Sequence, residues 1–347
     1  MKSMTHQRQF SAHESGRSAR LKRRSITVPA ILFSFLIGLG LYIPTALLAA
    51  FVDLCRGKPL PTVRLLTYGL WWLGIESGGI LKAAFLWLRF TPRQQLTSDN
   101  SLKAHSNLQY WWTSNLIRGA KSLLGLRFKL DGQESLEVGG PLVVLARHGS
   151  QGDALLVAAV LAEAGLRPRF IVKRQLLWDP CLDIVGHRIP NYFVDRDTTD
   201  NRTEIQNIGA LARDLESDEA IVIFPEGTRF SPSKLKRAIE MLSITAPERV
   251  ESVQRLSCVL PVRTPGFLSI LENNQDADVI LLNHVGVTDF KNLNDLWRNI
   301  PFPAPLHFNT ERLSRSELPP ISEPKALIEN IDQLWEKFDQ WVLSNQK

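Results

Sequence analysis

A long apolar run near the start of the chain limits the possible folds more than any other feature of the sequence. The run extends from Val28 to Val52, contains no charged residue and is interrupted by only two small polar side chains, Ser34 and Thr45. About 20 apolar residues cross the hydrocarbon core of a bilayer, so the run predicts a transmembrane helix at about 28–52. A cleaved signal peptide or a buried core helix are the alternatives. The run is longer than the apolar part of a typical signal peptide, and few soluble helices are apolar on every face.

The positive charge of the chain is concentrated in front of this run. Residues 1–25 contain seven basic residues and one acidic residue, whereas the rest of the chain contains 34 of each. A neutral body argues against nucleic acid as a partner and favours membrane lipids as the partners of the basic tail. Basic residues ahead of a first span also predict that the N-terminus lies in the cytoplasm.

A second apolar segment, at about 65–90, contains charged residues and three tryptophans. Tryptophans beside charges are typical of a membrane interface. The segment is therefore expected either to cross the bilayer as the second helix of a hairpin or to lie flat or re-entrant in it. Both alternatives leave the rest of the chain on the cytoplasmic face. We accordingly predict a basic tail at 1–25 and a membrane anchor at 26–91.

The residues after the anchor alternate between strand-like and helix-like patterns. A polar stretch at 92–107 suggests a linker, and the catalytic domain is expected at 108–347. Its predicted strands are 142–146, 168–173, 192–195, 220–224, 259–262 and 279–283, and its predicted helices are 154–164, 203–216 and 322–345. Alternation of this kind predicts an α/β fold, a mixed sheet flanked by helices. The last helix is amphipathic and is expected to pack on the body, with membrane contact as the alternative.

The cysteines and the acidic residues suggest no metal centre. Cys55, Cys181 and Cys258 lie far apart in the sequence and lack the spacing of a metal site. Because the chain has only three cysteines and they lie far apart, a disulfide scaffold is not expected, and a reducing compartment fits better. We therefore predict no metal and no cofactor.

A histidine and an aspartate are the candidate catalytic pair. His148 precedes Asp153 by five residues, in the run Arg-His-Gly-Ser-Gln-Gly-Asp. Five residues of a regular helix rotate by about 500°, so the two side chains cannot meet within one helix. They can meet if a loop follows His148 and Asp153 opens a helix, and Gly149 and Gly152 permit such a bend. The aspartate would then fix the tautomer of the histidine, whose other nitrogen could accept a proton.

The same spacing occurs a second time, in His284 and Asp289. The residues between them include β-branched Val285, Val287 and Thr288, which suit a tight turn poorly. With seven histidines in the chain, a chance repeat of the spacing is unsurprising. We therefore treat His284 as a rival to His148 and the weaker of the two.

An anion-binding turn is predicted downstream of His148. The apolar residues 220–224 lead into the block Pro-Glu226-Gly227-Thr228-Arg229. The Thr228 hydroxyl and the Gly227 amide can donate to an anion, and the planar guanidinium of Arg229 suits a phosphate. The plain alternative is a strand-to-helix turn that carries a surface arginine.

The His148–Asp153 pair followed by Glu226–Arg229 resembles the glycerolipid acyltransferases, the lysophosphatidic acid acyltransferase family. The resemblance implies a glycerol-phosphate acyltransferase-like fold, catalysis by His148 and Asp153, and an acceptor held by Glu226, Gly227, Thr228 and Arg229. The order of the motifs favours His148, because the family's pair precedes this block and His284 follows it. Arg147 departs from the family, which usually has asparagine there, and could add a phosphate contact or a salt bridge.

Two further motifs extend the resemblance to about residues 142–267. The run 191–196 is similar to the family's second motif, which assigns Arg196 to the acceptor phosphate, and Lys173 matches a lysine that often precedes it. Residues 260–267 are similar to the fourth motif. There we expect an apolar strand that runs into Pro261, as a structural wall of the acyl tunnel.

The expected activity is that of a membrane-bound O-acyltransferase on the cytoplasmic face. The acyl donor would be acyl-coenzyme A or acyl-carrier protein, and the acceptor 1-acyl-glycerol-3-phosphate, with lysophosphatidylglycerol or another lysophospholipid as alternatives. A lipid hydrolase is less favoured, because the chain has no Gly-x-Ser-x-Gly turn. A catalytically silent membrane scaffold is disfavoured by the intact His148, Asp153, Glu226 and Arg229.

Overall fold

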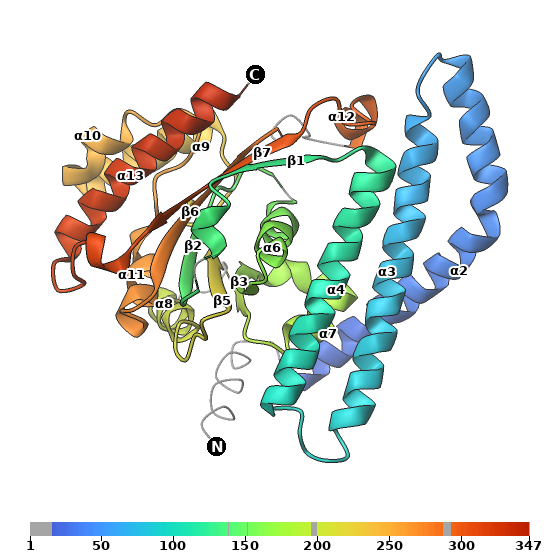
Figure 1. Cartoon of the computed structure of the whole chain (residues 1–347), viewed down its shortest axis with the longest axis horizontal. Helices are drawn as coiled ribbons and strands as arrows, with labels where there is room; N and C mark the ends of the chain where they lie inside the picture. Colours follow the sequence, from blue (N-terminus) through green and yellow to red (C-terminus); the bar gives the residue numbers. More distant parts are fainter. Residues whose placement is uncertain (1–15, 138, 151, 196–199, 287–292, 347) are drawn as a thin grey trace. The chain divides into compact units, whose positions relative to one another are not determined.

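The computed structural model describes residues 16–137, 139–150, 152–195, 200–286 and 293–346 (Figure 1). The chain forms two compact units. The helical unit comprises Met1–Arg127, Val172–Asp197 and Phe290–Pro305, and the sheet unit comprises Phe128–Ile171, Thr198–Asp289 and Leu306–Lys347. The division into tail, anchor and catalytic domain that the sequence suggests stays a prediction.

Three long helices build most of the helical unit: α2 (Arg17–Cys55), α3 (Pro61–Phe90) and α4 (Asp99–Leu124), with α3 packed against both of the others (Figure 1). Among the described residues, α2 is the helix that is long and apolar enough to cross a membrane. Only 6% of its most apolar stretch is buried. A core helix of a soluble protein would cover its apolar side chains, so this exposure argues against that alternative.

The turn from α2 to α3 is held by a buried aspartate. Asp53 accepts hydrogen bonds from the backbone amide and the hydroxyl of Thr62, at 2.8 and 2.7 Å. The second apolar segment is therefore a helix that follows the first directly, as expected of a hairpin. Whether α3 crosses a bilayer stays a prediction.

The predicted linker at 92–107 is wrong from residue 99 onward, because α4 begins there. Ser98 caps this helix, and its hydroxyl accepts the Ser101 amide at 3.3 Å. His105 is buried, and its Nδ1 lies 2.7 Å from the Ser101 carbonyl oxygen. The polar composition was misleading, because two of the polar residues, Ser101 and His105, are buried and bonded within the helix.

Short elements complete the helical unit: η1 (Arg174–Trp178), α7 (Pro180–Gly186), β4 (Tyr192–Val194) and α12 (Leu293–Arg298). Asp179 caps α7 by accepting the Leu182 amide at 2.8 Å. On α7, the buried Asp183 accepts hydrogen bonds from Arg23 and Arg24, with shortest distances of 2.8 and 3.0 Å. These bonds fasten the first turns of α2 to α7.

The sheet unit contains a mixed sheet with strand order β1-β7-β6-β2-β5-β3. Its strands are β1 (Phe128–Asp131), β2 (Leu142–Ala146), β3 (Arg167–Lys173, which runs past the limit of the unit), β5 (Glu219–Ile223), β6 (Asp278–Val285) and β7 (Leu306–Leu313). The β6–β7 pair is antiparallel and the other pairs are parallel. The predicted α/β class with a mixed sheet is confirmed.

Helices accompany this sheet: α5 (Glu134–Glu137), α6 (Asp153–Glu163), α8 (Asn201–Ala210), α9 (Pro232–Thr245), α10 (Val250–Val253), α11 (Thr264–Asn273) and α13 (Pro324–Asn345), with single turns η2 (Pro247–Arg249) and η3 (Arg315–Glu317). Every residue of β2 and β5 is buried, which explains why β2 is apolar throughout and β5 is apolar except for Glu219, whose carboxylate binds Arg169. The apolar face of α13 is buried and α13 contacts β6, as predicted for its amphipathic pattern.

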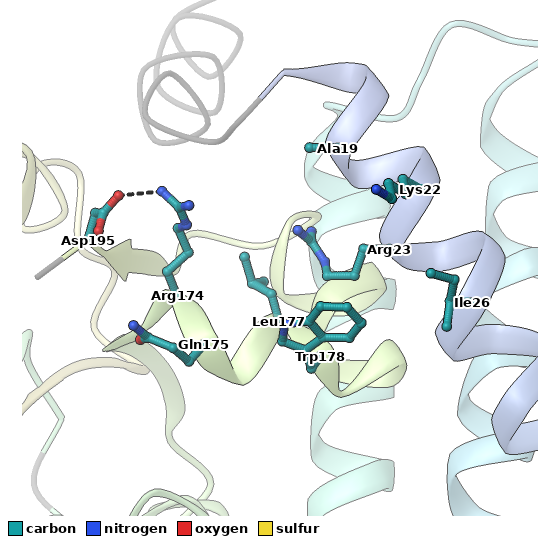
Figure 2. Close-up of a pocket in the computed structure, with 9 residues that line it drawn as sticks. All are labelled: Ala19, Lys22, Arg23, Ile26, Arg174, Gln175, Leu177, Trp178 and Asp195. Atoms are coloured by element: carbon teal, nitrogen blue, oxygen red, sulfur yellow. Dashed lines mark hydrogen bonds and ion pairs between the residues drawn. The ribbon is translucent and has the colours of Figure 1, made fainter. Parts of the chain in front are cut away.

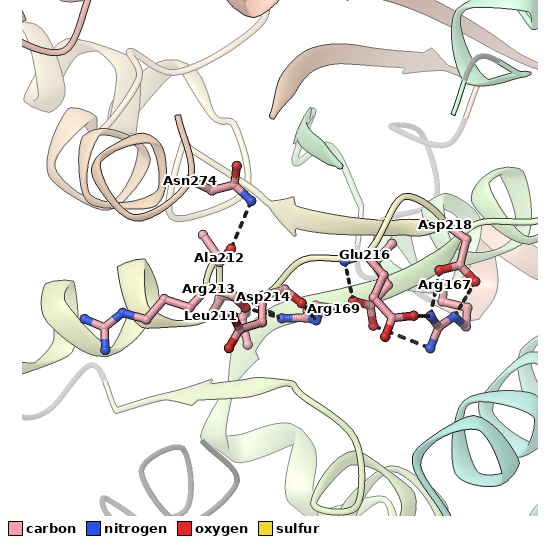
Figure 3. A network of polar contacts seen from close by, with 10 residues as sticks. Arg167, Arg169, Leu211, Ala212, Arg213, Asp214, Glu216, Asp218 and Asn274 are labelled. Carbon is pink, nitrogen blue, oxygen red and sulfur yellow. Dashed lines mark hydrogen bonds and ion pairs between the residues drawn. The ribbon is translucent and has the colours of Figure 1, made fainter. Parts of the chain in front are cut away.

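Helix α8 ends earlier than its sequence pattern predicts, at Ala210 and not at residue 216. The buried guanidinium of Arg169 donates to the carbonyl oxygens of Leu211, Arg213 and Asp214 at 2.9 to 3.1 Å (Figure 3). Carbonyl groups bound in this way are no longer available to a continuing helix. An arginine on β3 thus ends a helix that the local sequence favours.

Candidate active site

The catalytic histidine predicted from sequence lies just beyond the end of β2. This strand ends at Ala146, and α6 begins at Asp153 after a turn that contains Gly149 and Gly152. His148 Nδ1 lies 3.1 Å from Asp153 Oδ2. The predicted loop between the two residues and their contact are confirmed, and Nε2 is the ring nitrogen that remains to meet a substrate.

Asp153 is almost fully buried and has partners at both carboxylate oxygens. Oδ2 accepts the Ser150 amide at 2.8 Å in addition to His148, and Oδ1 accepts the Ser150 hydroxyl. Burial by itself would raise the pKa of Asp153, but the hydrogen bond from His148, the nearby His284 and the bonds from Ser150 together lower it. An ionised carboxylate is therefore held behind the imidazole.

His284, predicted as a rival of His148, contacts the same aspartate. It lies on β6, which pairs with β2 so that Leu282 stands opposite Ala146. Its Nε2 is 3.3 Å from Asp153 Oδ1 and 3.3 Å from the Arg147 carbonyl oxygen, and its side chain is buried. Burial lowers the pKa of His284, which favours the neutral ring. The proposed partner of the rival pair, Asp289, lies outside the described residues.

Arg147 does not offer a phosphate contact, contrary to one of our expectations. Its side chain is buried, and its guanidinium donates to the carbonyl oxygens of His284 at 2.7 Å and Cys258 at 3.3 Å. Burial lowers the pKa of Arg147, while the charges of Glu226 and Asp153 raise it. The arginine that replaces the family's asparagine is a core residue that links strand β6 to the His148 turn.

Glu226 connects the turn between His148 and Asp153, called the catalytic turn below, to the backbone of Leu260. Its buried carboxylate accepts the His148 amide at 2.6 Å and the Leu260 amide at 2.8 Å. Burial raises the pKa of Glu226 to about 8, although both hydrogen bonds lower it. Because the carboxylate faces backbone amides, the direct contact with an acceptor that the resemblance implies for Glu226 does not fit this geometry.

The rest of the predicted anion-binding turn is accessible. Gly227 has a positive φ of 70°, a conformation that favours glycine, and the Arg263 side chain packs against it. Thr228 is half-buried and Arg229 is exposed. Lys234 Nζ donates to the Thr228 hydroxyl and to the Arg229 carbonyl oxygen, both at 3.0 Å. Three cations therefore border this turn.

Sequence reasoning missed Lys234 and Arg263 as members of the group of cations at the anion-binding turn. A local signal for Lys234 exists, since Ser231 caps α9 and accepts the Lys234 amide, which puts the lysine in the first helical turn after the block. Arg263 has no such local signal. It reaches the turn because its amide donates to the Pro225 carbonyl oxygen at 2.9 Å.

The predicted strand at 259–262 is wrong, because side chains hold this segment. Asp339 accepts the Cys258 and Val259 amides at 2.6 and 2.9 Å, and Trp335 donates to the Leu260 carbonyl oxygen at 2.9 Å. The segment is apolar because it is buried, and it pairs with none of the strands in the described part of the chain. Pro261 is buried there, and its place in an acyl tunnel stays a prediction.

Two other predicted phosphate-binding residues are Lys173 and Arg196. Lys173 ends β3 and belongs to the helical unit. Arg196 lies outside the described residues. Their roles stay predictions.

Comparisons with known proteins cover the segment that contains the site. The sequence model of the family described as Acyltransferase matches residues 127–244, which include His148, Asp153 and Glu226–Arg229. A lyso-ornithine lipid O-acyltransferase of Rhizobium meliloti (strain 1021) is 27% identical over 150 residues, 43% of either protein. The 1-acyl-sn-glycerol-3-phosphate acyltransferase alpha of Mus musculus is 31% identical over 114 residues, 33% of this chain and 39% of the mouse protein. The chain thus matches less than half the length of these relatives.

The fold also has a counterpart among solved structures. The crystal structure of PlsC, the 1-acyl-sn-glycerophosphate acyltransferase of Thermotoga maritima, aligns with a TM-score of 0.50 and 16% identity, covering 80% of this chain and 96% of that protein. At this identity the likeness concerns the fold. Residues 127–244, the segment that carries the His148–Asp153 pair and the Glu226–Arg229 block, are thus similar to the family described as Acyltransferase.

Proposed function

We propose that the protein is a membrane-bound O-acyltransferase that transfers a fatty acyl group from a thioester to the free hydroxyl of a lysophospholipid. The observation that carries the proposal is the contact of His148 Nδ1 with Asp153 Oδ2. Glu226 accepts the backbone amide of His148 and stands just before the anion-binding residues Thr228 and Arg229. Hydrogen bonds thus connect the base, His148, to the segment that carries the anion-binding residues.

The reaction begins at His148. Its Nε2 accepts the proton of the acceptor hydroxyl while Asp153 stabilises the imidazolium that forms. The hydroxyl oxygen attacks the thioester carbonyl carbon, and a tetrahedral intermediate results. Collapse of the intermediate breaks the carbon–sulfur bond, and the proton on His148 passes to the departing thiolate. The products are the diacyl lipid and the free thiol of the donor.

The acceptor is held through its phosphate. Arg229, Lys234 and Arg263 surround the turn at Gly227 and Thr228, and cations of this kind recognise phosphate through charge-assisted hydrogen bonds. Glu226 supports this turn from inside. Fixing the phosphate keeps the reacting hydroxyl within reach of His148.

Among the acceptors, 1-acyl-glycerol-3-phosphate fits best, because its exposed phosphate monoester uses all three cations. Lysophosphatidylglycerol is the alternative. A lyso-ornithine lipid, the acceptor in the name of one relative, has no phosphate and would leave these cations unused.

The apolar, largely exposed α2 supports attachment to a membrane, with the catalytic residues on the cytoplasmic face where thioester donors are made. The donor is acyl-coenzyme A or acyl-carrier protein. The proposed chemistry uses protein side chains alone.

The test is acyl transfer in membranes that contain the full chain, with labelled acyl-coenzyme A or acyl-carrier protein and a panel of the three acceptors. We expect His148→Ala to lower kcat by at least about a hundredfold, the range of general base catalysis. The control is His307→Ala, because His307 also contacts an aspartate, Asp131, and its ring packs against Trp341 of α13. Retained transfer by His148→Ala would refute the mechanism, and release of free fatty acid without acylated lipid would indicate a hydrolase.

A further inference from the structure

The helical unit contains a pocket of about 400 Å³ that the catalytic proposal does not use. One wall is the first part of α2, with Lys22, Arg23 and Ile26. The other is η1, with Arg174 and Trp178 (Figure 2). Both walls lie within the helical unit, and the bonds from Arg23 and Arg24 to Asp183 fix the start of α2 in place.

The polar part of this pocket is cationic. Lys22, Arg23 and Arg174 line it together with one carboxylate, Asp195, which pairs with Arg174. Asp183 orients the guanidinium of Arg23 through two hydrogen bonds, at 3.2 and 2.8 Å. The Lys22 side chain is exposed. The lining therefore has an excess of positive charge, and its two arginines are held in position by carboxylates.

The remaining part of the pocket is apolar. Ile26 and Trp178 are 51% and 61% exposed, so the pocket presents large apolar side chains at its surface. Leu176, next to the pocket on η1, is 45% exposed. An exposed indole beside basic side chains is typical of residues at the boundary between lipid head groups and acyl chains.

The sequence position of the pocket agrees with such a boundary. Its α2 residues, 19–26, come directly before the apolar run that begins at Val28. Side chains along that run are widely exposed, including Phe33 at 64% and Ile43 at 69%. If the run is in the bilayer, the pocket is at the level of the head groups, and acyl chains can follow the surface of α2.

We propose that this pocket binds the head group of an anionic phospholipid of the bilayer. The phosphate would be held by Lys22, Arg23 and Arg174, and the upper part of the acyl chains would lie against Ile26 and Trp178. A zwitterionic lipid such as phosphatidylcholine also has a phosphate, but its trimethylammonium group would be repelled by the same cations. The inference is separate from the proposed catalysis, because it concerns lipid binding that involves no reaction.

The test is native mass spectrometry of the full chain in a neutral detergent, titrated with phosphatidylglycerol or phosphatidylcholine. We expect one phosphatidylglycerol molecule to bind at least about fivefold more tightly than phosphatidylcholine. This ratio of the two dissociation constants corresponds to the attraction between one basic residue and an anionic membrane surface. Lys22→Glu should remove this preference, and Trp178→Ala should weaken the binding of phosphatidylglycerol. Both side chains are exposed, so both variants are expected to fold.

The control for Lys22→Glu is Lys58→Glu, the same charge change just after the opposite end of α2. Equal binding of the two lipids, or unchanged phosphatidylglycerol binding by Lys22→Glu, would refute the proposal. Displacement of the lipid by inorganic phosphate or by lysophosphatidate at similar concentration would also refute it, since the pocket would then bind a soluble anion or the acceptor. His148→Ala should bind phosphatidylglycerol like the wild type, so failure of the catalytic proposal leaves this result unaffected.

Discussion

Asp153 lies between two histidines, with Oδ2 at 3.1 Å from His148 Nδ1 and Oδ1 at 3.3 Å from His284 Nε2. The His148 side chain is 16% exposed, whereas that of His284 is 1% exposed. His148 is therefore accessible to a substrate, whereas the buried His284 can act only by orienting the carboxylate.

Replacement of His284 should slow catalysis without weakening acceptor binding. Phenylalanine fills the same space but cannot donate to Asp153, whereas glutamine retains a side-chain N–H group. We expect His284→Phe to lower kcat about tenfold and to leave KM unchanged, because one hydrogen bond to a charged group is lost. In His284→Gln, kcat should recover in part. Steady-state kinetics would measure this. Equal kcat values for the two variants would show that the N–H group is unimportant.

The stability of the fold should depend on pH through Glu226. Its pKa is raised from 4.5 to about 8 in the folded chain, so between these values unfolding releases a proton, and rising pH favours unfolding. Stability is thus greatest below about pH 4.5 as far as Glu226 is concerned, and it falls by up to about 1.4 kcal/mol per pH unit until about pH 8. Asp153, with a lowered pKa, contributes to pH dependence only in more acidic solution.

The measurement is the midpoint of thermal unfolding of the detergent-solubilised chain from pH 5 to pH 9. Glu226→Gln has no charge to gain, so its midpoint should change less over this range even if the variant is less stable throughout. An identical pH profile for wild type and variant would contradict the assignment.

Gly227→Ala should damage the anion-binding turn. A Cβ atom there would lie 2.8 Å from Cδ and Nε of Arg263, and the φ of 70° disfavours other residues. We expect a loss of about 1–2 kcal/mol in the free energy of unfolding, together with a higher KM for the acceptor as Arg263 is displaced. The control is Gly139→Ala, where a Cβ atom meets nothing within 4 Å. An unchanged KM would argue against a role of Arg263 in acceptor binding.

Lys234 and Arg263 should determine the preference for phosphate-bearing acceptors. We expect alanine at either position to raise KM for 1-acyl-glycerol-3-phosphate about tenfold, the loss of one charge-assisted contact, and to leave KM for a lyso-ornithine lipid unchanged. Lys236→Ala is the matched control, because Lys236 is exposed on the same helix α9 as Lys234. A similar effect of all three variants would indicate general electrostatic attraction and no specific contact.

The parts of the fold that depend on local sequence were predictable. The β2–α6 region is one such part, since an apolar strand, two glycines and an aspartate at the helix start determine the geometry of His148 and Asp153 within a short stretch of chain. The buried strands β5 and β6 and the amphipathic α13 were predictable for the same reason.

Features that depend on distant partners were not predictable. The role of His284 follows from the pairing of β6 with β2, which no local pattern reveals. The segment 259–262 resembles a strand in composition, but Asp339 and Glu226 bind its amides in place of a strand. In the same way, the early end of α8 depends on Arg169 of another element.

The dependence of residues 258–260 on α13 has a consequence for biosynthesis. Asp339 and Trp335 bind the backbone of these residues, and Leu260 in turn binds Glu226, which holds His148. Since α13 is the last of the described helices to leave the ribosome, the catalytic turn cannot gain its full support during synthesis of the earlier residues. A nascent chain would therefore stay inactive until α13 has emerged and packed on residues 258–260.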